Sequence, residues 1–309
     1  MDQNNNTRRN FLKSLGLTLG AAGVGTSGLL FSCSKVTSVS AEGKIRLLTP
    51  GGSLVEVDAS QLTPAEMPSL TENQKRGRLG IEGKSWVMVI DLSKCRNARK
   101  CMAACQNHHQ LRPEQHHINV LQMQDADHTA PYYMPKPCMH CDNPPCTKVC
   151  PVNATFKRAD GIVLIDNERC IGCRFCIAAC PYSARVFNWF EPRDAEKYEG
   201  VTYNIEANVP QKKGTISKCL FSADLLREGK LPSCVSACPN SVYWFGDRNE
   251  DAVTNGTTKE TVGFSKLIRD NGGYTLMEEL GTKPRVYYLP PKNRTFPFEG
   301  DLIDHGHEA

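Results

Sequence analysis

The residues of this sequence best suited to chemistry are its 15 cysteines, which apart from Cys33 all lie between Cys95 and Cys238. They form four groups along the chain. The third group, "CIGCRFCIAACP", has the spacing C-x2-C-x2-C-x3-C before a proline, with thiols at Cys170, Cys173, Cys176 and Cys180. Thiolates at this spacing hold iron–sulfur clusters: three on a short loop wrap one face of a cubic cluster, and the fourth, turned away by the proline, reaches a neighbouring cluster.

The second group, "CMHCDNPPCTKVCP", repeats this pattern with two extra residues in its loop, and its thiols are Cys138, Cys141, Cys146 and Cys150. An exchange of fourth cysteines between the two groups predicts two 4Fe–4S clusters. The ligands of one are expected to be Cys138, Cys141, Cys146 and Cys180. The ligands of the other are expected to be Cys170, Cys173, Cys176 and Cys150.

Disulfides and structural zinc are the two alternative uses of these cysteines. Exported cysteine-rich chains often carry disulfides, and C-x2-C pairs also bind zinc. Disulfide scaffolds are mostly short, and a zinc ribbon needs neither a third cysteine at this spacing nor a fourth before a proline. We therefore favour clusters. Covalent haem is not indicated, because no C-x-x-C-H occurs.

The first and fourth groups match the same pattern with the second cysteine replaced, by Ala98 and by Ser222. The remaining thiols are Cys95, Cys101 and Cys105 in the first group and Cys219, Cys234 and Cys238 in the fourth. If these groups pair in the same way, Cys95 and Cys101 join Cys238. Likewise, Cys219 and Cys234 join Cys105. Because the decay of an unused motif would not spare the same three positions twice, we expect a cluster at each three-thiolate site.

The nuclearity of these two clusters depends on the replaced position. A cube corner without a protein ligand readily loses its iron, so 3Fe–4S clusters are expected at both sites. Alanine has no atom that binds iron, whereas the deprotonated hydroxyl of Ser222 can hold a fourth iron. The site of Cys105, Cys219 and Cys234 therefore has two alternatives, a 3Fe–4S cluster or a 4Fe–4S cluster with Ser222 as a ligand.

The histidines are expected to assist rather than to bind metal. His140 lies inside "CMHC" and is interpreted as a hydrogen-bonding neighbour of the ligands. The pairs His108–His109 and His116–His117 are interpreted as surface residues or as neighbours of the ligands. A separate metal site at these pairs is the alternative.

Short apolar runs flank the cysteine groups and must position them. Residues 86–92 ("WVMVIDL") and 161–170 ("GIVLIDNERC") lead into groups, while 184–189 ("ARVFNW") and 241–246 ("SVYWFG") follow groups. The order strand, cysteine loop, short helix, strand predicts an internal repeat of small α+β units. Residues 44–58 ("KIRLLTPGGSLVEVD") predict two short strands around Pro50-Gly51-Gly52.

The predicted fold class is α+β: two ferredoxin-like dicluster units, one inserted in the other, with irregular N- and C-terminal extensions. The predicted divisions are an export signal at 1–33, an N-terminal extension with a polar linker at 34–84, an outer unit of 85–124 plus 210–262, an inner unit at 125–209, and a C-terminal extension at 263–309. The proline-marked end of the last segment is expected to run extended over the surface.

The N-terminal sequence "TRRNFLKSLG" has the form of a twin-arginine export signal, with Arg8 and Arg9 before a short, glycine-rich apolar segment. A membrane anchor is the less favoured alternative, because the segment falls short of about 20 strongly apolar residues. "LFSC" resembles a lipoprotein box, so either Cys33 carries lipid or ordinary cleavage occurs nearby. The expected location is periplasmic or extracytoplasmic, with membrane association through lipid or a partner.

The net charge of +4, from 37 basic and 33 acidic residues, is too balanced for a nucleic-acid-binding protein. The apolar fraction of 40% and the aromatic fraction of 7% do not imply a large conventional core. Bound cofactors that fasten the chain together would supply the missing cohesion.

The cysteine motifs resemble those of a known family, the four-cluster ferredoxin-like iron–sulfur subunits of molybdenum or tungsten bis-pterin oxidoreductases. The likeness spans about residues 85–290 and depends on the second and third groups and on "KLPSCVSACP". Ala98, Ser222 and Gln106, which stands where a proline usually follows the fourth cysteine, depart from the family pattern. In nitrate-reductase-type members, a non-cysteine residue at the second position of the fourth group accompanies a 3Fe–4S cluster.

This resemblance implies a subunit that is not catalytic alone. Its clusters would relay electrons between a molybdopterin catalytic subunit and a multi-span, quinone-reactive membrane subunit. The alternative is a free periplasmic polyferredoxin shuttle, against which the long N-terminal lead-in and C-terminal tail weigh.

Overall fold

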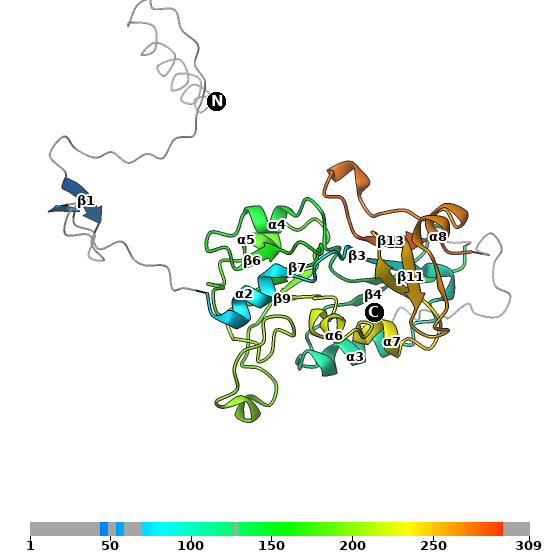
Figure 1. Cartoon of the computed structure of the whole chain (residues 1–309), viewed down its shortest axis with the longest axis horizontal. Coiled ribbons are helices and arrows are strands. Elements are labelled where there is room, and N and C mark those ends of the chain that lie inside the picture. Colours follow the sequence, from blue (N-terminus) through cyan, green and yellow to red (C-terminus); the bar gives the residue numbers. More distant parts are fainter. Residues whose placement is uncertain (1–43, 49–53, 59–69, 127–128, 293–309) are drawn as a thin grey trace, which may run out of the picture. The chain divides into compact units, whose positions relative to one another are not determined.

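The computed structural model describes residues 44–48, 54–58, 70–126 and 129–292 (Figure 1). The chain divides into two units, residues 1–68 and 69–309. The export signal at 1–33, Cys33 and the last part of the C-terminal extension at 293–309 lie outside the described residues. In the first unit, β1 (Lys44–Leu48) and β2 (Leu54–Asp58) pair antiparallel, as the two predicted strands. Within the described ranges, no helix is both long and apolar enough to cross a membrane.

The second unit repeats strand, cysteine loop, helix, strand four times, which confirms the predicted repeat. The first repeat contains β3 (Trp86–Asp91), the 3-10 helix η2 (Leu92–Lys94), α3 (Lys100–His108) and β4 (Asn119–Met123). The second contains β5 (Tyr132–Lys136), α4 (Pro145–Lys148) and β6 (Thr155–Lys157). The third contains β7 (Val163–Ile165), α5 (Phe175–Ala178) and β8 (Arg185–Phe187). The fourth contains β9 (Ile216–Lys218), α6 (Ala223–Arg227), α7 (Ser233–Ala237) and β10 (Tyr243–Asp247).

The repeats are joined by antiparallel strand pairs. The strand that leaves one repeat pairs with the strand that enters the next, as β4 with β5, β6 with β7, and β8 with β9. β10 then pairs with β3, with Tyr243 opposite Ile90, so that the fourth repeat returns to the first. This cyclic pairing places the last cysteine group beside the first one and the inner two groups beside each other.

The C-terminal segment completes the central sheet, whose strand order is β12-β11-β10-β3-β13. It contributes β11 (Ala252–Asn255), β12 (Thr261–Gly263), α8 (Phe264–Asp270), the 3-10 helix η4 (Glu278–Leu280) and β13 (Val286–Leu289). β13 runs parallel to β3 and buries Val286, Tyr288 and Leu289. An irregular surface extension was predicted here. The described part of the tail instead forms a strand that pairs with the edge of β3 not used by β10.

Part of the predicted linker is also ordered. α2 (Glu72–Leu79) begins at a capping box in which the Thr71 side chain accepts from the Gln74 backbone N–H and the Gln74 side chain accepts from the Thr71 backbone N–H. The helix packs on the rest of the second unit, where Arg78 lies 4.1 Å over the ring of Phe156. The sequence did not predict this helix because it lacks an apolar stripe. The helix packs instead through Arg78 and the buried Gly77.

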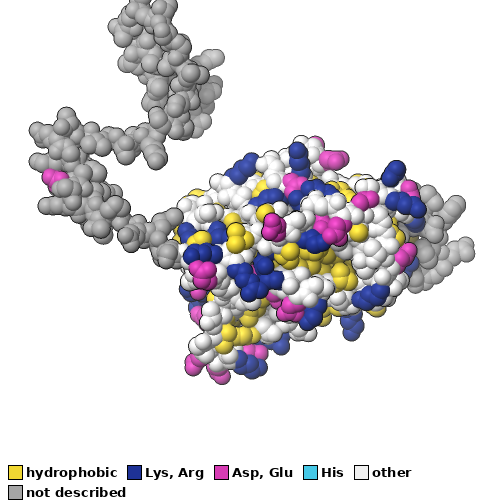
Figure 2. Space-filling view, in the orientation of Figure 1, with side chains coloured by type: hydrophobic (Ala, Val, Ile, Leu, Met, Phe, Trp, Pro, Cys, Tyr) yellow, Lys and Arg dark blue, Asp and Glu magenta, His cyan; other side chains and the backbone are white. Residues whose placement is uncertain are grey.

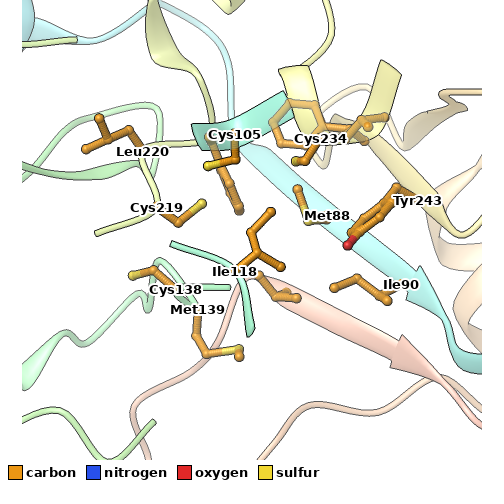
Figure 3. Packing of buried hydrophobic residues seen from close by; sticks show 14 of the residues in the cluster. Met88, Ile90, Cys105, Ile118, Cys138, Met139, Cys219, Leu220, Cys234 and Tyr243 are labelled. Atoms are coloured by element: carbon orange, nitrogen blue, oxygen red, sulfur yellow. The ribbon is translucent and has the colours of Figure 1, made fainter. Parts of the chain in front are cut away.

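Cysteines form much of the core. The main buried cluster joins Met88, Ile90, Leu220 and Tyr243 to thiols of the first, second and fourth groups. Figure 3 shows Cys105, Cys219 and Cys234 reaching one region of this core from three different segments. In Figure 1, α4, α5 and β6 lie at one end of the second unit and β11, β13 and α8 at the other. The thiols are therefore distributed along the interior rather than gathered in one cleft.

Candidate iron–sulfur sites

The structure gathers the cysteines into four sites, named here A to D. Site A is lined by Cys95, Cys101 and Cys238, with Ala98 in the same wall. Site B brings together Cys105, Cys219 and Cys234: burial raises the pKa of Cys105 and of Cys234, and the neighbouring thiol of Cys219 raises both further. Site C is lined by Cys138, Cys141, Cys146 and Cys180. Site D is lined by Cys150, Cys170, Cys173 and Cys176. The cysteines are grouped as the spacing predicts, including the exchange of Cys150 and Cys180, and their role as cluster ligands stays a prediction.

The cysteine loops share one backbone feature. The residue directly before the second ligand position has a positive φ in every group: Asn97 (55°), His140 (45°), Gly172 (70°) and Phe221 (55°). A positive φ is uncommon outside glycine and costs free energy, so three non-glycine residues adopting it at one position indicate a shared constraint. The loops with Ala98 and Ser222 therefore have the same turn as the loops that keep all four cysteines.

Gly172 shows how closely one of these loops is packed. Its φ is 70°, and a Cβ atom added there would lie 2.1 Å from the carbonyl oxygen of Gly214. Only glycine fits both the backbone conformation and the space. The loop between Cys170 and Cys173 is thereby fixed against the segment that leads into β9.

The first group ends differently from the others. A proline follows the fourth cysteine in the other groups, as Pro151, Pro181 and Pro239, and ends the helical turn there. In the first group Gln106 occupies this position and retains a backbone N–H. α3 therefore continues from Cys105 to His108.

The surroundings of the thiols suit ligands of an iron–sulfur cluster better than they suit free cysteines. All fourteen cysteines from Cys95 onward are free and buried or half-buried, and no disulfide joins them. Burial, reinforced by neighbouring thiols, raises the pKa of Cys141 to about 12 and that of Cys219 to about 11. Raised pKa values keep these thiols protonated near neutral pH, so they become thiolates only beside a cation. Iron supplies that positive charge. A buried guanidinium atom without a hydrogen-bond partner among the described residues, Nη2 of Arg185 in the wall of site C, also fits an acceptor-rich anion.

The sites follow one another in a line. Cys101 of site A and Cys105 of site B lie on α3, and the two thiols interact electrostatically. Cys219 of site B interacts in the same way with Cys138 of site C. Cys146 of site C interacts with Cys176 of site D. The order is therefore A, B, C, D, with thiols of each neighbouring pair of sites close enough to interact electrostatically.

Comparison with known proteins identifies the chain. Residues 129–201 match the family model of the 4Fe-4S dicluster domain. Over 304 residues the chain is 35% identical to the B subunit of the selenate reductase of Mesobacillus selenatarsenatis, an alignment that covers 92% of this chain and 97% of that protein. The chain belongs to the iron–sulfur subunit family of molybdopterin-type reductases.

Two further relatives agree with this assignment. The B subunit of the tetrathionate reductase of Salmonella typhimurium is 31% identical over 250 residues, covering 80% of this chain and 85% of that protein. The iron–sulfur cluster-binding subunit of the menaquinone reductase of Nitratidesulfovibrio vulgaris is 36% identical over 252 residues, covering 71% and 94%. The iron–sulfur subunit is thus a non-catalytic, electron-transferring member of a reductase complex, as the sequence resemblance implied.

Two buried cations of the iron–sulfur subunit were not predicted from its sequence. Arg185 interacts electrostatically with the thiols of Cys146 and Cys176, and Lys218 with those of Cys138 and Cys219. Lys218 is fully buried and donates from Nζ to the carbonyl oxygen of Cys219 at 2.6 Å. Their place on β8 and β9, directly beside the cysteine groups, was the only signal that the sequence offered. These positive charges lie where they would offset the negative charge of the proposed clusters and their thiolates.

The histidines of the iron–sulfur subunit differ in burial. His140 is fully buried: its Nδ1 accepts from the backbone N–H of Val163 at 3.0 Å, and its Nε2 has no hydrogen-bond partner among the described residues, so its role as a neighbour rather than a ligand stays a prediction. His109 and His117 are 1% and 4% exposed, so a surface position is wrong for both. Ser222 is buried, and its hydroxyl lies 3.3 Å from Oγ of Ser233 and accepts from the Ser233 backbone N–H at 3.3 Å. Ligation of iron by Ser222 stays a prediction.

Proposed function

We propose that the iron–sulfur subunit relays single electrons through clusters at sites A, B, C and D, in that spatial order. The observation that carries this proposal is the positive φ shared by Asn97, His140, Gly172 and Phe221. Successive backbone N–H groups in such turns point toward one side and bind anionic clusters. Because the turn is kept where the second cysteine is missing, all four loops are suited to a cluster.

The proposed cofactors are two 4Fe–4S clusters and two further clusters. Sites C and D, with four thiols each, would hold 4Fe–4S clusters. Site A would hold a 3Fe–4S cluster on Cys95, Cys101 and Cys238, because Ala98 offers no ligand atom. The three thiols of site B are compatible with either a 3Fe–4S or a 4Fe–4S cluster.

The proposed partners are a molybdopterin catalytic subunit and a multi-span, quinone-reactive membrane subunit. The relatives support both, since they are named as subunits of reductases and one belongs to a menaquinone reductase. Large apolar side chains are exposed beside site D, including Ile171 (64%), Phe175 (59%) and Trp189 (60%). An exposed apolar surface of this kind suits contact with a protein subunit. The names of the relatives also weigh against a free polyferredoxin shuttle.

Nucleic acid is not among the proposed partners. On the face of the second unit that Figure 2 shows, basic and acidic side chains are interspersed with hydrophobic ones. A nucleic-acid-binding surface would instead gather Lys and Arg in one patch or stripe.

The proposed location is periplasmic or extracytoplasmic. The twin-arginine pattern at Arg8 and Arg9 supports export of the folded, cofactor-loaded chain. Attachment to the membrane would come from the quinone-reactive partner or from lipid on Cys33.

The proposed domain organisation is an inner ferredoxin-like unit, 125–209, inserted into an outer unit of 85–124 and 210–262. The thiols of sites C and D support it, because all of them lie within the inner segment. The thiols of sites A and B all come from the outer segments. β13 adds a strand to the outer unit, beside β3, whereas α2 packs on the inner unit at Phe156.

Analysis of iron and acid-labile sulfide in anaerobically purified protein tests the proposal. We expect about 14 or 15 irons per chain, from two 4Fe–4S clusters, the 3Fe–4S cluster of site A and a cluster of three or four irons at site B. About half that iron, with sites C and D filled, would show that sites A and B are empty and would overturn the four-cluster relay.

A further inference from the structure

A tyrosine hydroxyl is buried at site A without a conventional hydrogen-bond partner. Tyr243 lines this site together with Cys95, Cys101 and Cys238. Tyr243 is 1% exposed, and its hydroxyl has no hydrogen-bond partner within the described ranges. A buried polar group left unpaired costs about 1–3 kcal/mol. Such a donor in the wall of a proposed cluster site indicates that its acceptor belongs to the occupied site.

The strand β10 fixes the direction of this side chain. Successive side chains of a strand point to opposite faces of the sheet. Tyr243, opposite Ile90 of β3, belongs to the core cluster that contains the thiols of site A, whereas Trp244 belongs to a separate apolar cluster. Figure 3 shows the hydroxyl oxygen of Tyr243 directed into the core, in the region of Met88 and Ile90. Neither of these side chains carries an oxygen or nitrogen that could accept from it.

The sulfur of Cys101 is the acceptor that the surroundings favour. Burial raises the pKa of Tyr243 well above its usual range, and the thiols of Cys101 and Cys234 raise it further, so the hydroxyl keeps its proton. Burial also raises the pKa of Cys101, and the neighbouring hydroxyl of Tyr243 acts in the opposite direction. The protonated hydroxyl and the thiol of Cys101 are therefore close enough to affect each other.

Binding of iron changes the quality of this acceptor. A protonated thiol accepts hydrogen bonds only weakly. A cysteine that binds a metal does so as a thiolate, and hydrogen bonds to an ionised group are shorter and stronger than those between neutral groups. The hydroxyl of Tyr243 is therefore better paired when Cys101 is an iron ligand than when it is a free thiol.

We propose that Tyr243 donates a hydrogen bond from its hydroxyl to the sulfur of iron-bound Cys101 and thereby raises the reduction potential of the cluster at site A. This inference rests on the proposed presence of a cluster at that site. Hydrogen bonds to the sulfurs of a cluster help to set its potential, and they favour the reduced form because it is the more negative one. Tyr243 acts through Cys101 and does not bind iron itself.

Site B is the other place where this hydroxyl could act, through Cys234. The thiol of Cys234 affects the pKa of Tyr243 less than that of Cys101 does. The main influences on the pKa of Cys234 are burial and other thiols rather than Tyr243. The shift in potential is therefore expected at site A.

Tyr243→Phe tests the proposal, because it removes the hydroxyl and keeps the ring that fills the core. Potentiometric EPR titration of the holoprotein follows the 3Fe–4S signal of site A, which is the signal that Ala98→Cys abolishes. At a fixed potential, the ratio of oxidised to reduced cluster should rise about tenfold, the effect of losing one hydrogen bond. This corresponds to a midpoint potential about 59 mV lower.

Tyr288→Phe is the matched control. Tyr288 is also fully buried, and its hydroxyl donates to the carbonyl oxygen of Pro135 at 3.1 Å. Pro135 lines site A as well, so this variant breaks a hydrogen bond beside the same site. The pKa of Tyr288 is raised by burial and by Tyr274 rather than by a thiol, so the midpoint potential should stay unchanged.

Three results would overturn the role of Tyr243: an unchanged midpoint potential in Tyr243→Phe, an equal shift in both variants, or a shift confined to site B. Each of these leaves the four-cluster relay intact, because the 3Fe–4S signal and the iron content are those of wild type. Iron missing from site A in the wild-type protein would overturn the relay and this inference together.

Discussion

The guanidinium of Arg185 lies beside the thiol of Cys146, inside the protein and in the wall of site C. Burial raises the pKa of Cys146, and the positive charge of Arg185 opposes that effect. On its other side the same guanidinium interacts with Cys176 of site D. One buried charge therefore acts on two neighbouring sites.

Arg185→Met should lower the reduction potentials of the clusters at sites C and D. A reduced cluster is more negative than an oxidised one, so the buried positive charge stabilises the reduced form. At about 6 Å and an effective dielectric constant of about 20, a unit charge contributes about 3 kcal/mol, equivalent to about 0.1 V for one electron. Potentiometric EPR titration measures both potentials.

Arg174→Met is the matched control for this prediction. Arg174 lines site D, but it is exposed, so water and salt screen its charge. In Arg174→Met the reduction potentials of the clusters at sites C and D should stay close to those of wild type. Equal shifts in the two variants would mean that burial of Arg185 does not matter.

Ala98→Cys should convert site A from a 3Fe–4S to a 4Fe–4S cluster. The position lies in the wall formed by Cys95, Cys101 and Cys238 and follows the turn at Asn97 that the four-thiol loops also have. A thiolate there retains the fourth iron, so the oxidised 3Fe–4S EPR signal should disappear. Ala103→Cys, exposed on the same stretch of chain, should leave the signal intact. A persistent signal in Ala98→Cys would contradict the proposed nuclearity of site A.

Gly172→Ala should empty site D selectively. The substitution combines a positive φ with a clash against the Gly214 carbonyl, so the loop must move. Gly200→Ala is the control, because Gly200 has φ +74° and open space around it. The control should cost only the backbone strain of about 1–2 kcal/mol. Iron content should fall by about one cluster in Gly172→Ala alone, and an equal loss in both variants would refute the role of packing.

Arg8→Lys with Arg9→Lys should leave the protein in the cytoplasm. Twin-arginine export depends on the paired guanidinium groups, and lysine preserves only their charge. Cell fractionation followed by immunoblotting locates the protein. Lys212→Arg with Lys213→Arg, an adjacent basic pair elsewhere in the chain, should not affect export. Normal export of the double-lysine variant would point to another route.

Much of the site could be predicted from the sequence, because thiol spacing and the prolines at Pro151 and Pro181 determine which loops exchange their fourth cysteine. The same logic grouped Cys95 with Cys238, although more than a hundred residues separate them. The repeat of strand and loop was equally readable, since each apolar run directly adjoins a cysteine group.

The remaining features depend on contacts that leave no local pattern. β13 looked like a surface segment because its partner, β3, is distant in the chain. α2 has a polar sequence, and its packing against Phe156 uses the stem of Arg78. The burial of His109 follows from the continuation of α3 past Gln106, which can be recognised only once the helix is seen to face Ala207.

The pairing of β10 with β3 has a consequence for biosynthesis. During translation, the proposed ligands of sites C and D have all left the ribosome once Cys180 has emerged. The ligand sets of sites A and B are complete only after Cys234 and Cys238 have emerged, and β10 can then pair with β3. If clusters are inserted while the chain is being made, the two inner sites are the first that can be filled. A premature stop codon between the third and fourth cysteine groups leaves a chain that can mature only those inner sites and cannot close its sheet.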